Sequence, residues 1–230
     1  MEKKTQKVYA RLLQHRLIAL LTPASPEECL VAFTALDPLG ITLEIALRSP
    51  AALPGIRHLL KRHPDALVLA GTVMTAQQAD EVIAAGVAGI VCPDYFSQVV
   101  ERCVAADVMC IPGGIADVGK QLAQKAALYG CGIEELQQRY PCQYIHKLFP
   151  AVTDTVSFMG LAPAWKGPFK GLQMVYTGGV SLKNLADLVA YDPSGIFCGS
   201  ALTRAMPDVA QMRAEAVKWV TILSTATASK

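Results

Sequence analysis

The chain has 230 residues, which suits one domain with a sizeable buried core, and we expect a single domain over residues 1–230. A net charge of +2 argues against nucleic acid as a partner. No stretch comes near the roughly 18 apolar residues that a membrane span requires, and residues 1–14 are charged and lack an apolar signal region. We therefore expect a cytoplasmic protein with no membrane partner.

Hydrophobic residues make up 52% of the chain and charged residues only 17%, a balance typical of parallel sheets whose strands are buried on both faces. The seven cysteines form no Cys-x-x-Cys pair, and the four histidines do not cluster. We interpret the cysteines as reduced thiols and expect neither a metal site nor a cofactor.

Short apolar runs alternate with helical patterns along the whole chain, which indicates β-α units around a parallel sheet. We expect eight strands, at residues 17–21, 42–47, 66–70, 89–92, 108–111, 144–148, 172–176 and 195–198. Helical patterns occur at residues 26–36, 50–62, 76–85, 97–105, 118–129, 182–189 and 208–223. Eight units in this length predict an α/β fold of the (β/α)8 TIM-barrel type, with an extra helix at the N-terminus.

The second predicted strand carries two charged side chains. Its alternation places Leu43 and Ile45 on one face, and Glu44 and Arg48 on the other. Because the apolar face must meet the helices, Glu44 and Arg48 point into the barrel, near the strand end where barrels of this type carry catalytic residues. A buried carboxylate and guanidinium are costly unless they pair or take part in chemistry. The alternatives are a structural Glu44–Arg48 pair and a functional site.

Lys147 ends an apolar run in the sixth predicted strand. It shares a face with Ile145 and Phe149, whereas His146 and Leu148 take the other face. If Ile145 faces the barrel interior, so does Lys147, and we interpret His146 as a histidine packed on the helix side. An amine buried near Arg48 has its charged form disfavoured, and the neutral amine is the nucleophile that forms a Schiff base with a ketone. The alternative is a strand-end lysine whose charged head reaches solvent.

Two glycine turns follow the last two predicted strands. Gly178 and Gly179 come after the seventh strand, and Gly199 and Ser200 come after the eighth, before the last helix. Barrels of this type commonly bind phosphate at these places, where backbone N–H groups at helix N-termini donate to it. The two turns together predict a phosphate-binding site.

Seven motifs, in this order, resemble those of the class I aldolases that cleave 2-keto-3-deoxy-6-phosphogluconate (KDPG) and 4-hydroxy-2-oxoglutarate (KHG). The resemblance runs from about residue 17 to about residue 220. The motifs are Glu-x-x-x-Arg at 44–48, Gly-Thr-Val at 71–73, Ile-Pro-Gly at 111–113, Lys-Leu-Phe-Pro at 147–150, Lys-Gly-Pro-Phe at 166–169, Thr-Gly-Gly-Val at 177–180 and Gly-Ser-Ala-Leu at 199–202.

The resemblance implies a role for each matching residue. Lys147 matches the family's Schiff-base lysine, and Glu44 matches its general acid/base glutamate. Arg48 and Thr72 match the residues that hold the pyruvoyl carboxylate. Pro93 matches a proline after the family's fourth strand, and Phe149 matches the aromatic residue beside the lysine. The residues that match those binding a substrate phosphate in the family are Thr177, Gly178, Gly179, Gly199 and Ser200.

The implied function is that of an aldolase acting on a small keto acid. It would cleave a 2-dehydro-3-deoxy-phosphogluconate-type substrate to pyruvate and glyceraldehyde 3-phosphate, or KHG to pyruvate and glyoxylate. The family forms trimers, so the resemblance also implies a homotrimer. Two other hypotheses are a phosphate-binding barrel isomerase or synthase without Schiff-base chemistry, and a keto-acid-binding barrel without turnover.

The chain departs from the family pattern around the mouth of the barrel. Residues 128–143 are an addition that we interpret as an inserted helix before strand six. Many members end the first strand with arginine, where this chain has Leu21 and Thr22, and Cys92-Pro93 replaces the usual Ser-Pro. These differences concern the distal part of the substrate, because the residues that match the pyruvoyl end are all present.

Overall fold

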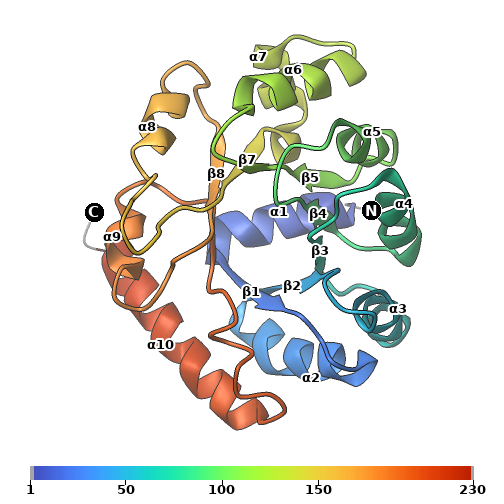
Figure 1. Ribbon diagram of the computed structural model, residues 1–230, viewed down its shortest axis with the longest axis vertical. Coiled ribbons are helices and arrows are strands. Elements are labelled where there is room, and N and C mark those ends of the chain that lie inside the picture. Colours follow the sequence, from blue (N-terminus) through green and yellow to red (C-terminus); the bar gives the residue numbers. More distant parts are fainter. Residues whose placement is uncertain (1–2, 229–230) are drawn as a thin grey trace.

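The computed structural model describes residues 3–228, in which helices and strands alternate around a central barrel (Figure 1). The strands are β1 (Leu17–Leu21), β2 (Thr42–Ala46), β3 (Leu69–Gly71), β4 (Gly89–Val91), β5 (Met109–Ile111), β6 (Gly113–Gly114), β7 (Ile145–Leu148), β8 (Gln173–Tyr176) and β9 (Gly195–Phe197). The helices are α1 (Lys4–His15), α2 (Pro26–Leu36), α3 (Ala52–Arg62), α4 (Ala76–Ala85), α5 (Ser97–Ala105), α6 (Val118–Leu128), α7 (Ile133–Arg139), α8 (Leu161–Lys166), α9 (Leu185–Val189) and α10 (Val209–Ala228).

The nine parallel strands form one sheet in the order β5-β4-β3-β2-β1-β9-β8-β7-β6, which wraps into a nearly closed barrel. Its two ends, β5 and β6, are separated in the chain by Pro112 alone. β5 pairs with β4 and β6 pairs with β7, so the two segments together occupy one strand position. Proline has no N–H to donate to a strand ladder, which accounts for the break. The predicted (β/α)8 architecture is confirmed.

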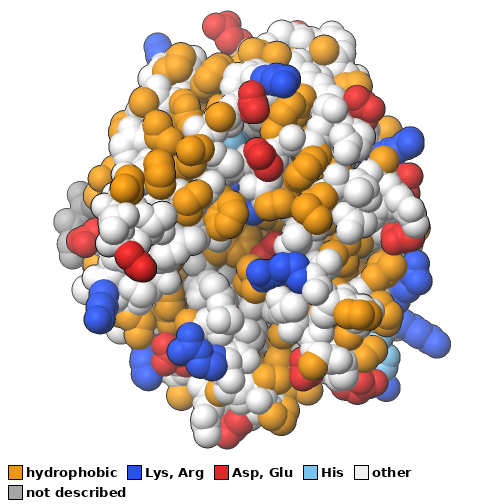
Figure 2. Space-filling view, in the orientation of Figure 1, with side chains coloured by type: hydrophobic (Ala, Val, Ile, Leu, Met, Phe, Trp, Pro, Cys, Tyr) orange, Lys and Arg blue, Asp and Glu red, His pale blue; other side chains and the backbone are white. Residues whose placement is uncertain are grey.

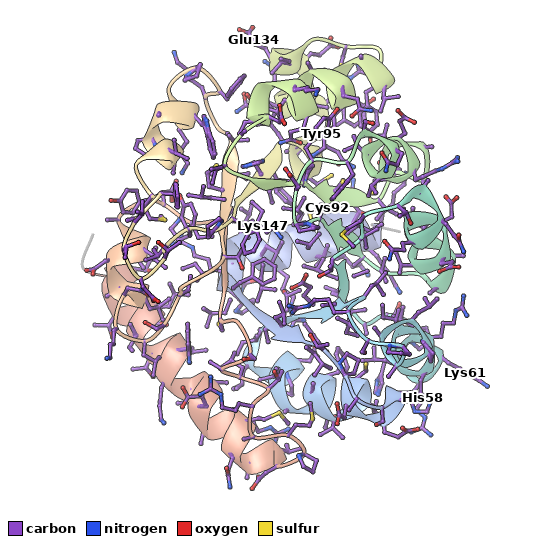
Figure 3. The ribbon with its side chains drawn as sticks, viewed as in Figure 1. His58, Lys61, Cys92, Tyr95, Glu134 and Lys147 are labelled. Carbon is purple, nitrogen blue, oxygen red and sulfur yellow. The ribbon has the colours of Figure 1, made fainter. Side chains whose placement is uncertain are left out.

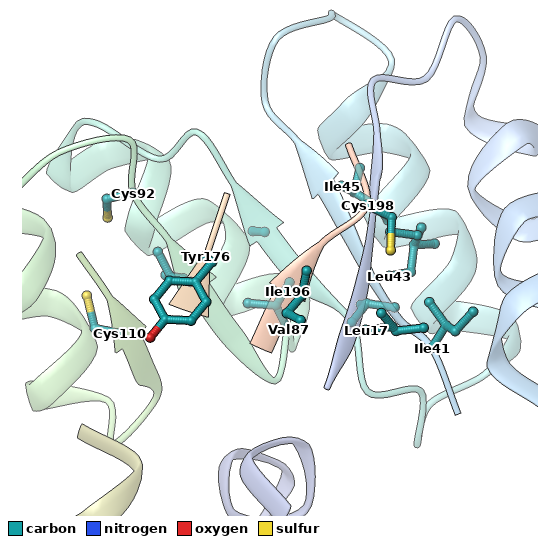
Figure 4. Close-up of a cluster of buried hydrophobic side chains, with 14 of the residues drawn as sticks. Leu17, Ile41, Leu43, Ile45, Val87, Cys92, Cys110, Tyr176, Ile196 and Cys198 are labelled. Atoms are coloured by element: carbon teal, nitrogen blue, oxygen red, sulfur yellow. The ribbon is translucent and has the colours of Figure 1, made fainter. Parts of the chain in front are cut away.

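Alternating side chains along the strands build two cores. Inside the barrel lies an apolar layer that includes Ile145, Val175 and Phe197, and Val8 and Leu12 of α1 cover it. The predicted N-terminal helix is therefore present, and it runs across the middle of the barrel in Figure 1. The larger core lies between the strands and the surrounding helices, and Figure 4 shows part of it.

Some element boundaries differ from the prediction. The third strand is Leu69–Gly71 and not 66–70. The addition over residues 128–143 holds a shorter helix than expected, α7, followed by a 3-10 turn at Pro141–Gln143. Gly130 and Gly132 lie just before the first residue of α7, Ile133. Glycine disfavours helix, which accounts for the later start. No helix within residues 3–228 is long and apolar enough to cross a membrane.

Candidate active site

Lys147 points into the barrel from β7. Its residue neighbours fix this direction: Ile145 belongs to the interior layer, whereas the His146 ring lies 5.1 Å from the Trp165 ring, on the helix side. Lys147 is only 7% exposed, and its Nζ lies 5.3 Å from the centre of the Phe149 ring. Figure 3 places Lys147 near the centre of the molecule. The predicted orientation is confirmed, and the solvent-reaching alternative is wrong.

The amine of Lys147 sits in a poorly solvated place. Burial lowers its pKa, and the nearby charge of Arg48 lowers it further, while Glu44 and Cys92 act in the opposite direction. The loss of hydration is the largest of these effects, since water stabilises only the charged form. A larger fraction of this amine is therefore neutral, and nucleophilic, than for a surface lysine.

Glu44 projects from β2 into the same interior and is 3% exposed. Burial raises the pKa of its carboxyl to about 7, although Lys147 and then Arg48 favour the charged form. Its Oε2 atom has no hydrogen-bond partner within residues 3–228. Nor do Glu44 and Arg48 form an ion pair in the described chain, so the structural-pair alternative is wrong. A carboxyl with a pKa near 7 and a free oxygen suits proton transfer.

Three other predicted residues lie just after the carboxyl ends of β2, β3 and β4. Arg48 lies in the exposed turn after β2, and Thr72 follows β3 with a left-handed backbone (φ 57°). Pro93 follows β4, and its carbonyl lies 2.7 Å from the position that a Cβ on Gly113 would take. The Lys147 Cε atom lies at the same distance from that position, so Pro93 and the lysine stem flank one glycine.

A cavity of ≈ 560 Å³ opens at the carboxyl ends of β1, β2, β7, β8 and β9. The face in Figure 2 is hollowed at its centre, with charged side chains around the hollow. The cavity brings together six of the predicted residues: Arg48, Phe149, Thr177, Gly178, Gly199 and Ser200. Lys147, Glu44, Thr72 and Pro93 are not among its lining residues. Gly179 is not either, since its backbone packs against the Val152 carbonyl.

Neither glycine turn leads directly into an α-helix, so the backbone N–H groups of the two turns are not at helix N-termini as the predicted phosphate site required. After Gly178 and Gly179 the chain forms a turn, and α9 starts only at Leu185. After Ser200 a run of turns continues to residue 207, and α10 starts at Val209. The physical reason is local: the Asn184 side chain accepts from the Ser181 N–H at 2.8 Å and donates to the Gly179 carbonyl at 2.9 Å, which holds a turn.

The cavity also contains side chains that sequence reasoning missed. They include Thr22, Glu28, Thr203 and Arg204. Thr203 and Arg204 belong to the turn that we expected to be the approach to the last helix. The sequence feature that could have pointed to them is the seven-residue gap between Ser200 and the predicted helix start at residue 208, which is long enough for a structured turn at the strand end.

Within residues 3–228, no three His, Cys, Asp or Glu side chains gather in a way that could hold a metal ion. All seven cysteines are free thiols. A thiol hydrogen bond with Cys110, and then burial, raise the pKa of Cys92, which is the cysteine whose charge affects the pKa of Lys147. The raised pKa favours the protonated Cys92 thiol.

Comparison with known proteins decides the family. The model of the "KDPG and KHG aldolase" family matches residues 8–215. This chain belongs to the KDPG and KHG aldolase family. It is similar to the 2-dehydro-3-deoxy-phosphogluconate aldolases of Haemophilus influenzae (29% identity over 87% of each chain) and Treponema pallidum (29% over 84% of each). A solved 4-hydroxy-2-oxoglutarate/2-dehydro-3-deoxyphosphogluconate aldolase structure covers 94% of this chain and 98% of its own at 25% identity, with a TM-score of 0.76.

The KDPG and KHG aldolase assignment makes this protein an aldolase, and therefore a lyase. It supports neither the isomerase or synthase hypothesis nor that of a barrel without turnover. The family match also spans the whole barrel, from α1 to the first turns of α10.

Proposed function

We propose that this aldolase forms a Schiff base between Lys147 and a 2-keto acid, with Glu44 as its general acid/base. The observation that carries the proposal is the pair itself: a buried amine of lowered pKa beside a buried carboxyl of pKa about 7, both inside one barrel. The relatives' names support a 2-keto-3-deoxy-6-phospho sugar acid as substrate, cleaved to pyruvate and glyceraldehyde 3-phosphate. The similar solved structure adds KHG, cleaved to pyruvate and glyoxylate.

The chemistry follows from these two side chains. The neutral Lys147 amine attacks the C2 ketone, and protonation by Glu44 lets the resulting hydroxyl leave as water, which gives the protonated Schiff base. Glu44, now ionised, removes the C4 hydroxyl proton. The C3–C4 bond then breaks, its electrons pass to the Schiff-base nitrogen, and the aldehyde departs. Glu44 returns the proton to C3 of the enamine, and water releases pyruvate from Lys147.

The surrounding residues would bind and orient the substrate. Arg48 suits the pyruvoyl carboxylate, because a guanidinium binds a carboxylate through two parallel hydrogen bonds. Thr72, Pro93 and Phe149 would complete this end of the site. Thr177, Gly178, Gly199 and Ser200 line the cavity and would meet the distal end of the substrate, with Gly179 supporting the turn from behind.

Two further expectations belong to the proposal. The family resemblance supports a homotrimer, and light scattering in solution should give three times the molar mass of the chain. A monomer would contradict it. We also propose a cytoplasmic location, which the free thiols of the seven cysteines support.

Pyruvate release tests the function directly. The purified full-length protein is incubated with KDPG and, separately, with KHG, and pyruvate is followed by its reduction with lactate dehydrogenase. We expect release from at least one of them, abolished in Lys147→Met. A folded protein that releases pyruvate from neither would contradict the proposed substrates.

A further inference from the structure

The ≈ 560 Å³ cavity at the strand ends is lined by a second arginine, Arg204, to which the chemistry above gives no role. Arg204 lies in the turn between β9 and α10 and lines the same cavity as Arg48 and Ser200. We propose that Arg204 binds the anionic group at the far end of the substrate, in the half that leaves as the aldehyde. This inference rests on the proposed function and adds to it a residue that determines specificity.

The turn that carries Arg204 is anchored to the barrel immediately before it. Leu202 is fully buried and Thr203 is 8% exposed. The Thr203 hydroxyl donates to the Leu20 carbonyl of β1 at 2.9 Å, and the Thr203 N–H donates to the Ser200 carbonyl at 3.2 Å. The backbone of Arg204 is thus held at the cavity rim, which reduces the ordering cost of binding a ligand there.

The Arg204 guanidinium forms no ion pair with a carboxylate within the part of the chain that the structure describes. The candidate partner on its outer side is Glu215, across a neighbouring groove. The Glu215 oxygens are already engaged, one by Lys218 Nζ at 2.8 Å and the other by Trp219 Nε1 at 3.1 Å. The guanidinium is therefore available for an external anion.

The charges of the cavity match a substrate with two anionic ends. Two guanidinium groups line it, those of Arg48 and Arg204, and the carboxylate of Glu28 accepts the Ala24 N–H at 2.7 Å. Arg48 follows the strand that carries Glu44, so it serves the pyruvoyl end. Arg204 follows the Gly199–Ser200 turn after β9, and β9 is separated from β2 in the sheet by β1. A phosphate or a carboxylate at the distal end supplies the anion that this second cation would bind, through the bidentate geometry of arginine.

Three substrates test this role and identify the anion. They are KDPG, its unphosphorylated counterpart 2-keto-3-deoxygluconate, and KHG, whose distal group is a carboxylate. We expect Arg204→Gln to lower kcat/KM about 10- to 100-fold for a substrate with a distal anion, the range of a hydrogen bond to a charged group. For 2-keto-3-deoxygluconate the change should stay below about threefold on the same reasoning. Arg204→Lys, which keeps the charge, should recover part of the loss.

The pattern of losses identifies the ligand. A loss with KDPG alone assigns a phosphate to Arg204, and a loss with KHG alone assigns a carboxylate. Inhibition by inorganic phosphate should weaken in Arg204→Gln in the first case. The matched control is Lys183→Gln, which removes a positive charge from the exposed segment after Gly179, outside the cavity, and should change none of the three values.

Equal losses with all three substrates, or no loss with any, would overturn the role of Arg204. Borohydride trapping of pyruvate on Lys147 separates this failure from failure of the proposed function. Pyruvate has no distal group. Suppose that wild type and Arg204→Gln both trap pyruvate and that the kcat/KM values for the three substrates stand in the same ratios in both proteins. Then the Arg204 inference alone is wrong. If wild-type protein traps none, the Schiff-base proposal is wrong whatever Arg204 does.

Discussion

The Glu44 carboxylate occupies the space that a side chain at Gly71 would fill. An ideal Cβ on Gly71 would lie 1.6 Å from the Oε1 atom of Glu44. In the parallel register Glu44 of β2 is opposite Leu69 of β3, and Gly71 is opposite Ala46, so the Glu44 side chain extends to a position two residues further along β3. Because Gly71 has no side chain, the Glu44 carboxylate can lie over β3. Both Glu44 and Lys147 are buried inside the barrel.

Replacing Gly71 with alanine should displace Glu44. Because a misplacement of about 1 Å can reduce a rate about 100-fold, we expect Gly71→Ala to lower kcat about 10- to 100-fold. The overpacked strand should also lose about 1–3 kcal/mol of stability. Steady-state kinetics and urea unfolding measure the two effects. Gly132→Ala is the control, since nothing lies within 4 Å of its Cβ position. Wild-type kcat in Gly71→Ala would show that the position of Glu44 does not matter.

Glu44→Gln should slow aldol cleavage by about two to four orders of magnitude, the usual range for loss of a general acid/base. The wild-type pH–rate profile should show an inflection near the pKa of about 7 that burial gives this carboxyl. The variant cannot titrate there, so the inflection should disappear. Rates measured from pH 5 to 9 test both points. An unchanged profile in Glu44→Gln would assign the proton transfers to another group.

The same pKa predicts how stability depends on pH. The Glu44 pKa is raised from 4.5 in the unfolded chain to about 7 in the folded protein, so between these values the folded state binds more protons. Stability must then fall as pH rises from 4.5 through 7, by roughly 3 kcal/mol from this group. Urea unfolding of wild type and Glu44→Gln at several pH values isolates the contribution. A difference between them that does not change with pH would contradict the raised pKa.

A second buried lysine, Lys125, should matter for stability and not for chemistry. It is fully buried on α6, and its Nζ donates to the carbonyls of Cys110 and Gln143, both at 2.8 Å. Lys125→Met leaves both carbonyls without this donor, which should reduce the free energy of unfolding by about 2–4 kcal/mol. The folded variant should still form an adduct with pyruvate. An adduct on Lys125 in wild type, or none in the folded variant, would contradict this division of roles.

Periodicity in the sequence predicted one of the two central side chains outright and the other conditionally. In β2 the apolar face of Leu43 and Ile45 has to meet the helices, so the alternation placed Glu44 inside. In β7 the alternation tied Lys147 to the face of Ile145, and the structure shows that this face is the interior one. The same alternation put His146 on the opposite face, where the structure shows it against Trp165. Such inferences succeed because the side-chain period of a strand is fixed by its backbone.

The rim of the site could not be predicted in the same way. The contacts that hold Arg204 at the cavity join residues far apart in the chain, such as Thr203 and Leu20. Likewise the Gly179 backbone meets Val152, a contact set by how two loops pack. Turn conformation depends on such tertiary contacts, and no local pattern in the sequence encodes them.

The most direct test of the account is to trap the Schiff base. The wild-type protein is incubated with pyruvate and sodium borohydride, its intact mass is measured, and the adduct is located by peptide mapping, with Lys147→Met and Lys125→Met alongside. We predict a lactyl-sized mass increase on Lys147, present in Lys125→Met and absent in Lys147→Met. A folded wild-type protein with no adduct, or an adduct at another lysine, would contradict the central claim.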